Sequence, residues 1–309
     1  MVTLAEFDAV ADRVSNWGRW GEHDQRGTLN FVTPEVVRKG AAAVVTGEAF
    51  SLGMTLSLNG PQDGSPPPGR INPVRTMLAV NTPLSDSPHA ARYSDDIVVT
   101  PTQTATHWDA LAHTTFRGLM YNGFPDTAVD SSGATKLGIE SAGEIVSRGV
   151  LLDVARHQGV DVLPGRFPIT RSVLEAVEES QRSPVERGDI VLIRTGQASF
   201  FLAGDVPRYR RPLAACDYDT ALYFHEREVA AAAIDNAPFE LIPGAVEEVV
   251  LPLHVLNLVY TGLFQGENFV LEDLAAACAT DRRYTFLLNA TPERFLRSTG
   301  GMVNPVAIR

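Results

Sequence analysis

Two kinds of hydrophobic pattern recur along the chain. Short runs rich in Val, Ile and Leu between Gly, Pro or Asp are typical of strands, and stretches with apolar residues three or four apart are typical of helices. The strand-like runs are Phe50–Leu58, Val74–Val80, Ile97–Gln103, Gly149–Val154, Ile190–Arg194 and Tyr284–Asn289. The helical stretches are the first segment before Trp17, then Thr33 to Gly47, Thr170–Ser180, Thr220–Ala233 and Leu271–Ala279.

The order of these elements predicts an α/β fold. Strands and helices alternate in the second half of the chain, whereas the early strands follow one another and favour antiparallel pairing. We therefore expect a mixed β-sheet with flanking helices. A Pro/Gly-rich stretch, Asn59–Pro73, contains Pro66-Pro67-Pro68. Too little chain precedes it for a separate domain, so residues 1–309 are expected to form one domain with a flexible loop at 59–73.

Composition and charge exclude several classes of protein. The 309 residues are 44% hydrophobic and 20% charged, which is ordinary for a globular protein. A formal charge of −11 repels polyanions, and the densest basic cluster, Arg208, Arg210 and Arg211, is short. We therefore expect no nucleic acid among the partners and a small-molecule substrate instead.

We also expect a protein without a membrane span, located in a reducing compartment. The longest apolar run, Val249–Val259, is broken by Pro252, His254 and Asn257, so it does not predict a membrane span. The first residues carry acids and no apolar signal-peptide core. With only two cysteines in the chain, a disulfide scaffold is excluded and a cytoplasmic location is expected.

The segment from Gln103 to His113 is the most informative for chemistry. It holds two of the seven histidines with an aspartate between them. His107 and Asp109 are two residues apart, so in an extended segment they project from the same face. His113 reaches the same point if the chain turns after Ala110. Imidazole and carboxylate together suit zinc, manganese or iron, so the spacing predicts a metal site rather than two hydrogen-bonded histidines at a strand end.

Two further candidates lie far downstream. His254 occupies an otherwise apolar segment, where an unpartnered imidazole would be costly to bury. Glu267 is flanked by apolar and small residues. Alone, each is typical of a structural role. Together with the upstream cluster they would complete a coordination shell, an assembly that spacing does not establish.

The segment Thr104–His113 resembles the metal-binding signature of the cyclase family, approximately H-x-G-T-H-x-D-A-x-x-H. That family includes bacterial kynurenine formamidase and isatin hydrolase. Arg19–Pro34 and Gly188–Gly196 are similar to its longer members, as are the late His254 and Glu267. The resemblance spans most of the chain and implies a compact, swivelling β/β/α domain. It also implies a homodimer or homotetramer, with residues 1–33 and 59–73 as segments that cover the active site.

Carried over by position, the resemblance assigns His107 and Asp109 as metal ligands. His113 matches the last histidine of the motif, which binds a second metal or acts in catalysis in different members. His254 and Glu267 match the downstream histidine and glutamate.

Two residues depart from the family's signature. Gln103 stands where the motif has its first histidine, and Ala105 where it has glycine. A glutamine oxygen is a much weaker zinc ligand than imidazole. Gln103 is therefore a weak candidate ligand, and the departure favours a single zinc or manganese ion. Asp109, His113, His254 and Glu267 would hold this ion, and His107 would lie nearby.

The family's mechanism is one that these residues favour physically. A bound metal lowers the pKa of its water to about 7 and polarises a carbonyl. Glu267, or a histidine not committed to the metal, transfers the proton to the leaving group. His225 is a further catalytic candidate because its neighbours resemble the longer members, although a histidine in a charged helical turn is usually a surface residue.

The resulting hypothesis is metal-dependent hydrolysis of an amide, lactam or lactone bond in a small, cyclic or aromatic substrate. Two alternatives stay open: a lyase or cyclase that uses the same metal to polarise a carbonyl, and a catalytically silent member that binds a metal or ligand. Gln103 keeps the second alternative open. The chain contains neither a G-x-S-x-G elbow nor the glycine-rich loops that bind nucleotides.

Overall fold

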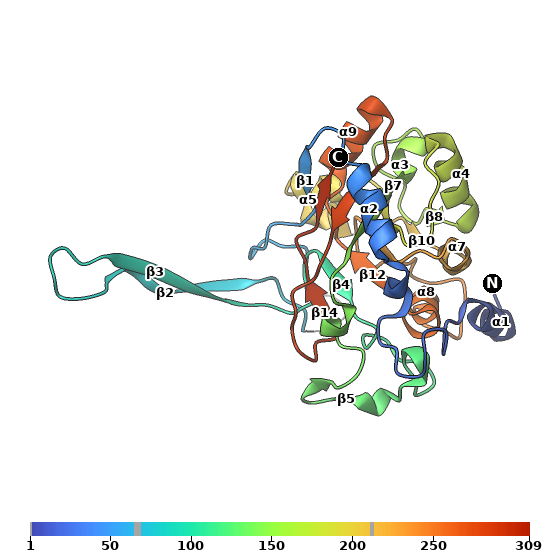
Figure 1. Ribbon diagram of the computed structural model, residues 1–309, viewed down its shortest axis with the longest axis horizontal. Helices are drawn as coiled ribbons and strands as arrows, with labels where there is room; N and C mark the ends of the chain where they lie inside the picture. The colour runs from blue at the N-terminus through green and yellow to red at the C-terminus, as the bar shows by residue number, and fades with distance from the viewer. Residues whose placement is uncertain (1, 65–68, 211–212) are drawn as a thin grey trace.

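A mixed sheet forms the centre of the computed structural model, which describes residues 2–64, 69–210 and 213–309 (Figure 1). Within these residues the sheet has nine strands. Across the sheet they are β1 (Ala49–Ser51), β15 (Val306–Ile308), β13 (Thr285–Asn289), β7 (Val146–Asp153), β9 (Ile190–Arg194), β11 (Ala231–Ile234), β12 (Phe264–Glu267), β4 (His107–Asp109) and β14 (Gly300–Met302).

The middle of this sheet is parallel and its flanks are antiparallel. Strands β7, β9, β11 and β12 run parallel, while β15, β13 and β4 each pair antiparallel with their neighbours. The parallel strands β9 and β11 are buried along their whole length, as expected when both faces of a sheet are covered. The predictions of an α/β fold and of a mixed sheet are therefore confirmed.

The pleat of the strands divides the core in two. On β7, Leu151 points into one hydrophobic cluster and Val150 and Leu152 into the other. Helices α1 (Leu4–Val14), α4 (Arg171–Gln181), α7 (Thr220–Glu226) and the π-helix η5 (Val255–Thr261) pack into the second cluster. Helix α9 (Glu272–Asp281) packs into the first, and α2 (Pro34–Ala42) lies against β7 and β13.

Shorter elements complete the described chain. The remaining helical turns are η1 (Gly27–Phe31), η2 (Tyr121–Gly123), η3 (Asp126–Ala128), η4 (Ile139–Ala142), α3 (Val154–His157), α5 (Ala198–Leu202), α6 (Val206–Arg210) and α8 (Pro252–His254). Small two-stranded pairs are formed by β5 (Val129–Asp130) with β6 (Gly133–Ala134) and by β8 (Pro168–Ile169) with β10 (Ala215–Cys216). No helix in the described ranges has both the length and the apolar character needed to cross a membrane.

Several predicted elements are confirmed where local signals are strong. Thr33 caps α2 and Thr170 caps α4, each accepting a hydrogen bond from a backbone N–H three residues on. The first segment is helical, and strand β9 has the predicted bounds, Ile190–Arg194. The bounds of two other predicted strands differ from those of β13 and β7 by at most three residues. These predicted strands are Tyr284–Asn289 and Gly149–Val154.

Other predicted bounds are wrong. The helix predicted over Thr220–Ala233 ends at Glu226. Its last three alanines, residues 231–233, belong to strand β11, because burial between two parallel strands outweighs the helix propensity of alanine. The strand predicted over Phe50–Leu58 is limited to Ala49–Ser51. Helix α2 ends at Ala42, before Gly47.

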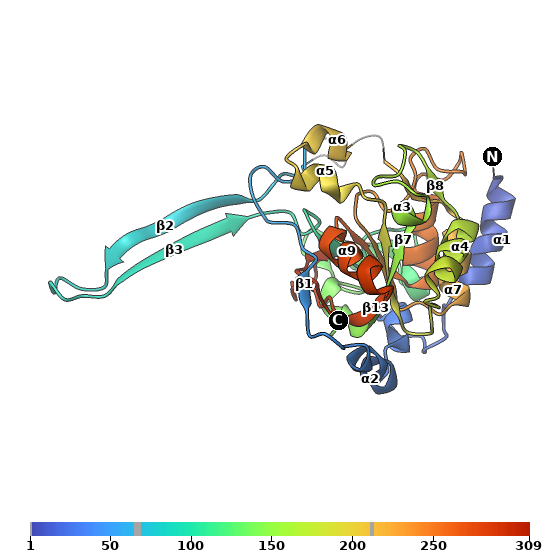
Figure 2. The same cartoon turned by 90° about the horizontal axis from the view of Figure 1, so that it is seen from above.

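A hairpin arm leaves the body beside the sheet (Figures 1 and 2). It consists of β2 (Val74–Pro83) and β3 (Arg92–Val99), which pair only with each other. The predicted loop 59–73 leads into it. Pro66, Pro67 and Pro68 lie outside the described residues, as does Arg211 of the basic cluster.

Candidate metal centre

The register between β4 and β12 brings three of the predicted residues to one face of the sheet. His107 pairs directly with Glu267, and Asp109 with Gln265. Residues that are opposite each other in an antiparallel pair, or two apart on one strand, project to the same side. Trp108, between the two ligand candidates, projects to the other side, where it is fully buried and its Nε1 donates to the Ala290 carbonyl over 2.8 Å.

His254 reaches the same point from α8. The N-terminus of α8 is closed by the carboxylate of Glu240, which accepts from the Leu253 N–H (3.0 Å) and the His254 N–H (2.7 Å). The same carboxylate accepts a short hydrogen bond from Nδ1 of the His254 ring. Glu240 thus fixes both the helix start and the ring, and it leaves Nε2 of His254 directed at the β4–β12 face.

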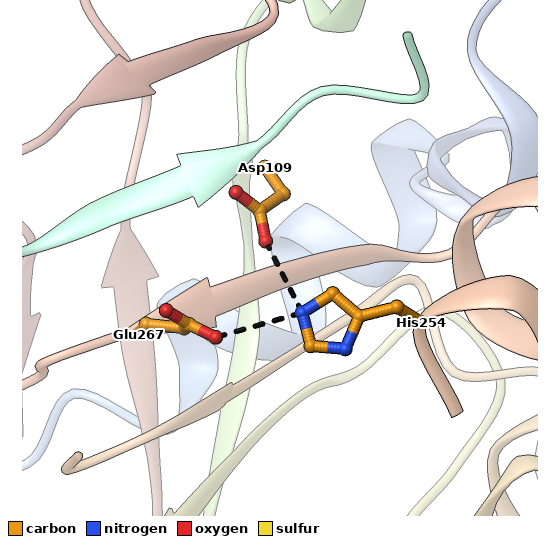
Figure 3. Close-up of side chains that lie close together, drawn as sticks. All are labelled: Asp109, His254 and Glu267. Atoms are coloured by element: carbon orange, nitrogen blue, oxygen red, sulfur yellow. Dashed lines mark ion pairs between the residues drawn. The ribbon is translucent and has the colours of Figure 1, made fainter. Parts of the chain in front are cut away.

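Four buried side chains converge there. In Figure 3 the His254 ring points between the carboxylates of Asp109 and Glu267. His254 Nε2 lies 4.0 Å from Asp109 Oδ2 and 3.7 Å from Glu267 Oε1. His107 Nε2 lies 3.7 Å from Asp109 Oδ1 and 3.5 Å from Glu267 Oε2. The side chains of all four are at most 5% exposed.

These separations suit a shared cation better than direct hydrogen bonds. They exceed the roughly 2.7–3.2 Å of a hydrogen bond. Two ligand atoms that each lie about 2.1 Å from a tetrahedral zinc ion are about 3.4 Å apart. Ligand atoms of Asp109, His254 and Glu267 all lie within 4.8 Å of one another, as expected for groups that could hold a metal ion.

Two unpaired polar atoms support the same conclusion. Nε2 of His107 and Oδ1 of Asp109 are buried without a hydrogen-bond partner. Nδ1 of His107 contacts the Ala105 carbonyl at 2.8 Å, so Nδ1 carries the proton and Nε2 presents its lone pair to the cluster. A buried lone pair facing a buried carboxylate oxygen is costly unless a cation lies between them. The residues therefore fit a divalent metal ion.

Charge at the site also favours a cation. Burial raises the pKa of Asp109, but the neighbouring imidazoles of His113, His107 and His254 outweigh it, so its pKa lies below the usual value. Burial likewise raises the pKa of Glu267, yet its contact with His254 gives a net lowering. Both carboxylates are ionised at neutral pH, and Glu240 adds a third acid behind His254. Burial lowers the pKa of His254, but its contacts with Glu240 and Glu267 raise it to about 10, so its positive charge offsets only one of these three acids. The remaining buried negative charge favours a further cation.

His113 lies at the edge of the cluster. Its Nε2 is 3.6 Å from Asp109 Oδ1, and its side chain is 25% exposed, more than any of the four buried residues. Gln103 Nε2 lies 3.4 Å from Nδ1 of His113 and donates to the Thr299 hydroxyl over 3.0 Å. The Gln103 carbonyl accepts from Thr102 over 2.9 Å. Gln103 therefore contacts His113 and directs its oxygen at Thr102 instead of the cluster.

Among the described contacts, none joins His225 to this cluster. His225 lies on α7, and the charged groups that influence its pKa are Arg19, Glu226, Glu228 and Arg13. Burial and Arg19 lower the pKa of His225. The side chain is half-buried and its Nδ1 is buried without a hydrogen-bond partner, so a catalytic role for His225 stays a prediction.

The N-terminal segment packs on the helix that follows His254. The Asn16 side chain donates to Thr261 O (2.9 Å), and Trp17 Nε1 donates to Val259 O (2.7 Å). Thr28 N donates to Gly262 O (2.9 Å). This segment therefore satisfies carbonyls at the end of η5. The covering role proposed for residues 1–33 stays a prediction.

Three residues near the cluster were missed by the sequence analysis. Glu240 holds His254, and Gln265 Nε2 donates to Asp109 Oδ2 over 3.3 Å. The charge of Arg70, in the segment before the arm, lowers the pKa of both Asp109 and His113. Gln265 could have been found only if the strand Phe264–Glu267 had been predicted, because it lies two residues before Glu267 on the same face of that strand. Glu240 and Arg70 carry no local signal.

The α/β fold and the buried Asp–His–Glu group define a protein with a candidate divalent-metal centre at the junction of β4 and β12. The chain belongs to the cyclase family: the family model described as "Putative cyclase" matches residues 50–240. The cyclase-like fold predicted from the signature is therefore confirmed.

Solved structures agree with this family. A structure described as a novel cyclase is 37% identical, with a TM-score of 0.88, and the match covers 97% of this chain and 99% of that one. An isatin hydrolase bound to the product analogue thioisatinate is 18% identical (TM-score 0.64; 89% and 98% covered). Isatin hydrolase A from Labrenzia aggregata is 16% identical (TM-score 0.64; 86% and 94% covered). The chain matches none of the curated proteins.

Proposed function

We propose that this protein is a metal-dependent hydrolase that opens an amide, lactam or lactone bond in a small, cyclic or aromatic substrate. The observation that carries the proposal is the convergence of His107, Asp109, His254 and Glu267, with separations of 3.5–4.0 Å and unpaired ligand atoms on His107 and Asp109. Among similar folds, isatin hydrolases act on a substrate of this kind, which supports the proposed substrate class.

The four residues would hold one zinc or manganese ion. Two imidazoles and two carboxylates are ligands that both metals accept. When bound, such an ion supplies a Lewis acid and a water of lowered pKa. The chain's own contribution is to fix the ligands, with Glu240 holding His254 and the Ala105 carbonyl holding His107.

His113 is the residue we assign to proton transfer. It is the most exposed member of the cluster, so it faces the side from which a substrate arrives. In the hydrolysis, a water oxygen bonds to the acyl carbon, the C–N or C–O bond breaks, and the proton passes through His113 to the leaving nitrogen or oxygen. Gln103 contacts the other ring nitrogen and positions the imidazole. Glu267 is assigned to the metal, with proton transfer as its second candidate role.

The proposal is tested by hydrolysis of isatin, a formyl-anilide and an aromatic lactone with zinc or manganese added. We expect turnover that is lost with a chelator and restored by metal. Asp109→Asn should abolish turnover, whereas His225→Ala, as a control for loss of a histidine, should retain it. Full activity after chelation would exclude the mechanism.

Isotope labelling separates hydrolysis from the alternative reactions. A hydrolase incorporates oxygen from labelled water into the new carboxylate, whereas a lyase or ring-closing enzyme does not. Metal binding without turnover of any of the three substrates would favour the catalytically silent member instead.

A further inference from the structure

A polar cavity lies away from the candidate metal centre. Its volume of about 520 Å³ is within the roughly 300–1,000 Å³ usual for small-ligand pockets. Three arginines line it: Arg156 in α3, Arg182 directly after α4 and Arg282 directly after α9. Figure 1 shows these three helices at the same end of the body. The whole chain carries a formal charge of −11, so this cavity concentrates positive charge in an acidic protein.

The positive charge of the cavity is not balanced by neighbouring acids. Within the described residues, neither Arg182 nor Arg282 forms an ion pair or a side-chain hydrogen bond. Arg156 donates through Nε to Asp153 over 3.1 Å, which leaves its two terminal nitrogens for a ligand. The C-terminal ends of α4 and α9 contribute about half a negative charge each. The guanidinium groups therefore keep the cavity positive.

A buried phenol lies beside these arginines. Tyr284 lines the cavity and is 7% exposed, yet its hydroxyl has no hydrogen-bond partner in the described part of the chain. Burial raises the pKa of Tyr284, whereas Arg156 and Arg282 lower it, so both guanidinium groups lie near the hydroxyl. A buried tyrosine usually has a partner for its hydroxyl. The helix dipole favours an arginine at each helix C-terminus, but it does not account for an unpartnered phenol beside them.

The other polar groups of the lining are already engaged. Gln181 Nε2 donates to the Leu151 carbonyl over 2.6 Å, and its Oε1 accepts from the Asp153 N–H over 2.8 Å. The Ser180 hydroxyl donates to the Val177 carbonyl over 3.0 Å. The groups that remain for a ligand are guanidinium N–H groups and one phenol O–H. A positively charged lining rich in donors selects an anion rich in acceptors.

We propose that this cavity binds a small organic phosphate, either a diphosphate or an ester with two phosphate groups. A phosphate group offers three acceptor oxygens and up to two negative charges, and it matches the fork of a guanidinium group. Two such groups use three arginines and a phenol more fully than the single charge of a carboxylate.

The cavity is separate from the candidate metal centre. Arg156 follows β7, whereas Glu267 ends β12, and β9 and β11 lie between these two strands. Three strand spacings amount to about 14 Å. The phosphate site is therefore a second site, and the inference does not depend on the proposed hydrolysis.

Calorimetric titration with pyrophosphate at low ionic strength tests the proposal. Arg182 and Arg282 have φ of +52° and +59°, which glycine adopts without strain, so Arg182→Gly with Arg282→Gly removes both charges and should keep the fold. We expect saturable binding to the wild type and at least about a 100-fold loss of affinity in the double variant. Arg166→Gly is the matched control: Arg166 is exposed, has φ of +66° and lies outside the cavity lining, so affinity should be unchanged.

Two further variants and a second probe locate and define the site. Tyr284→Phe removes only the hydroxyl and should weaken pyrophosphate binding about tenfold. Because pyrophosphate also binds metal ions, Asp109→Asn is included, and it should retain the binding. Tricarballylate, which offers carboxylates alone, should bind at least about tenfold more weakly. The proposal would be overturned by a wild type that does not bind pyrophosphate, by full affinity in the double glycine variant or in Tyr284→Phe, by loss of binding in Asp109→Asn, or by tighter binding of tricarballylate.

Discussion

At the residue scale, Ala105 shows why the family signature has glycine at this point. Its φ is +50°, in the left-handed region that glycine adopts without strain. The turn is needed because the Ala105 carbonyl contacts Nδ1 of His107 and accepts from Asn268 Nδ2. Alanine adopts the same turn with some backbone strain, and its methyl group is buried against Tyr209 and Met54.

This conformation predicts a graded response to substitution at position 105. For Ala105→Gly, relief of about 1–2 kcal/mol of backbone strain favours the folded state, whereas the loss of the buried methyl group and the greater chain entropy of the unfolded state oppose it. The free energy of unfolding should therefore change by less than about 1 kcal/mol. Ala105→Val should destabilise by about 2 kcal/mol or more, because a β-branched residue rarely adopts positive φ. Urea denaturation measures both, and equal stability of Val and Ala would contradict the assigned turn.

Glu240 gives the second prediction at this scale. Glu240→Gln keeps the shape but removes the charge that orients His254, so metal affinity should fall by about 10–100-fold. Glu247→Gln, an exposed acid seven residues on, is the matched control and should bind metal normally. Competition with a chromophoric chelator measures the affinity. An unchanged value for Glu240→Gln would contradict the role assigned to the Glu240 charge in holding His254.

Some residues of the candidate metal centre could be predicted from the sequence and others could not, for a physical reason. His107 and Asp109 are two residues apart on one strand, and this spacing is visible in the sequence. Glu267 was found through its apolar and small neighbours and the family resemblance. His254 was found through its apolar surroundings and the family resemblance. Glu240 was missed because its role depends on the approach of the α8 N-terminus, a tertiary contact that leaves no periodic signal.

At the element scale, η5 connects the N-terminal segment to the site. It is a π-helix that begins after His254 and ends before Gly262 and β12. π-helical turns are rare and often occur at functional sites. Gly27 packs directly on its end: a methyl group added to Gly27 would lie only 2.0 Å from the Gly262 carbonyl oxygen.

Gly27→Ala should therefore destabilise the protein by about 3 kcal/mol or more, through backbone clash in addition to strain at φ +53°. Gly18→Ala is the control: its φ is +75°, but nothing lies within 4 Å of the added methyl group. It should cost only about 1–2 kcal/mol. Thermal and urea unfolding compare the two, and equal losses would contradict the close packing on η5.

The elements also show the limit of local patterns. Thr33 and Thr170 gave correct helix starts because capping is a local interaction. Ala231–Ile234 form a strand because β9 and β12 flank them, which the alanine-rich sequence does not reveal.

At the scale of the whole molecule, the mixed character of the sheet was predictable but its strand order was not. β4 lies between β12 and β14, although more than 150 residues separate it from either along the chain. Long-range pairings of this kind follow from packing of the complete chain. They also create the metal centre, because three ligand candidates face one another only once β4 and β12 pair.

Metal content per chain is the measurement that tests the central claim most directly. Protein purified without chelators should contain about one zinc or manganese ion per chain by elemental analysis, as expected for one shared set of four ligands. Asp109→Asn should lose the ion, and His225→Ala should retain it. No metal in the wild type, or equal metal in Asp109→Asn, would contradict the account, and about two ions per chain would contradict the single-ion site.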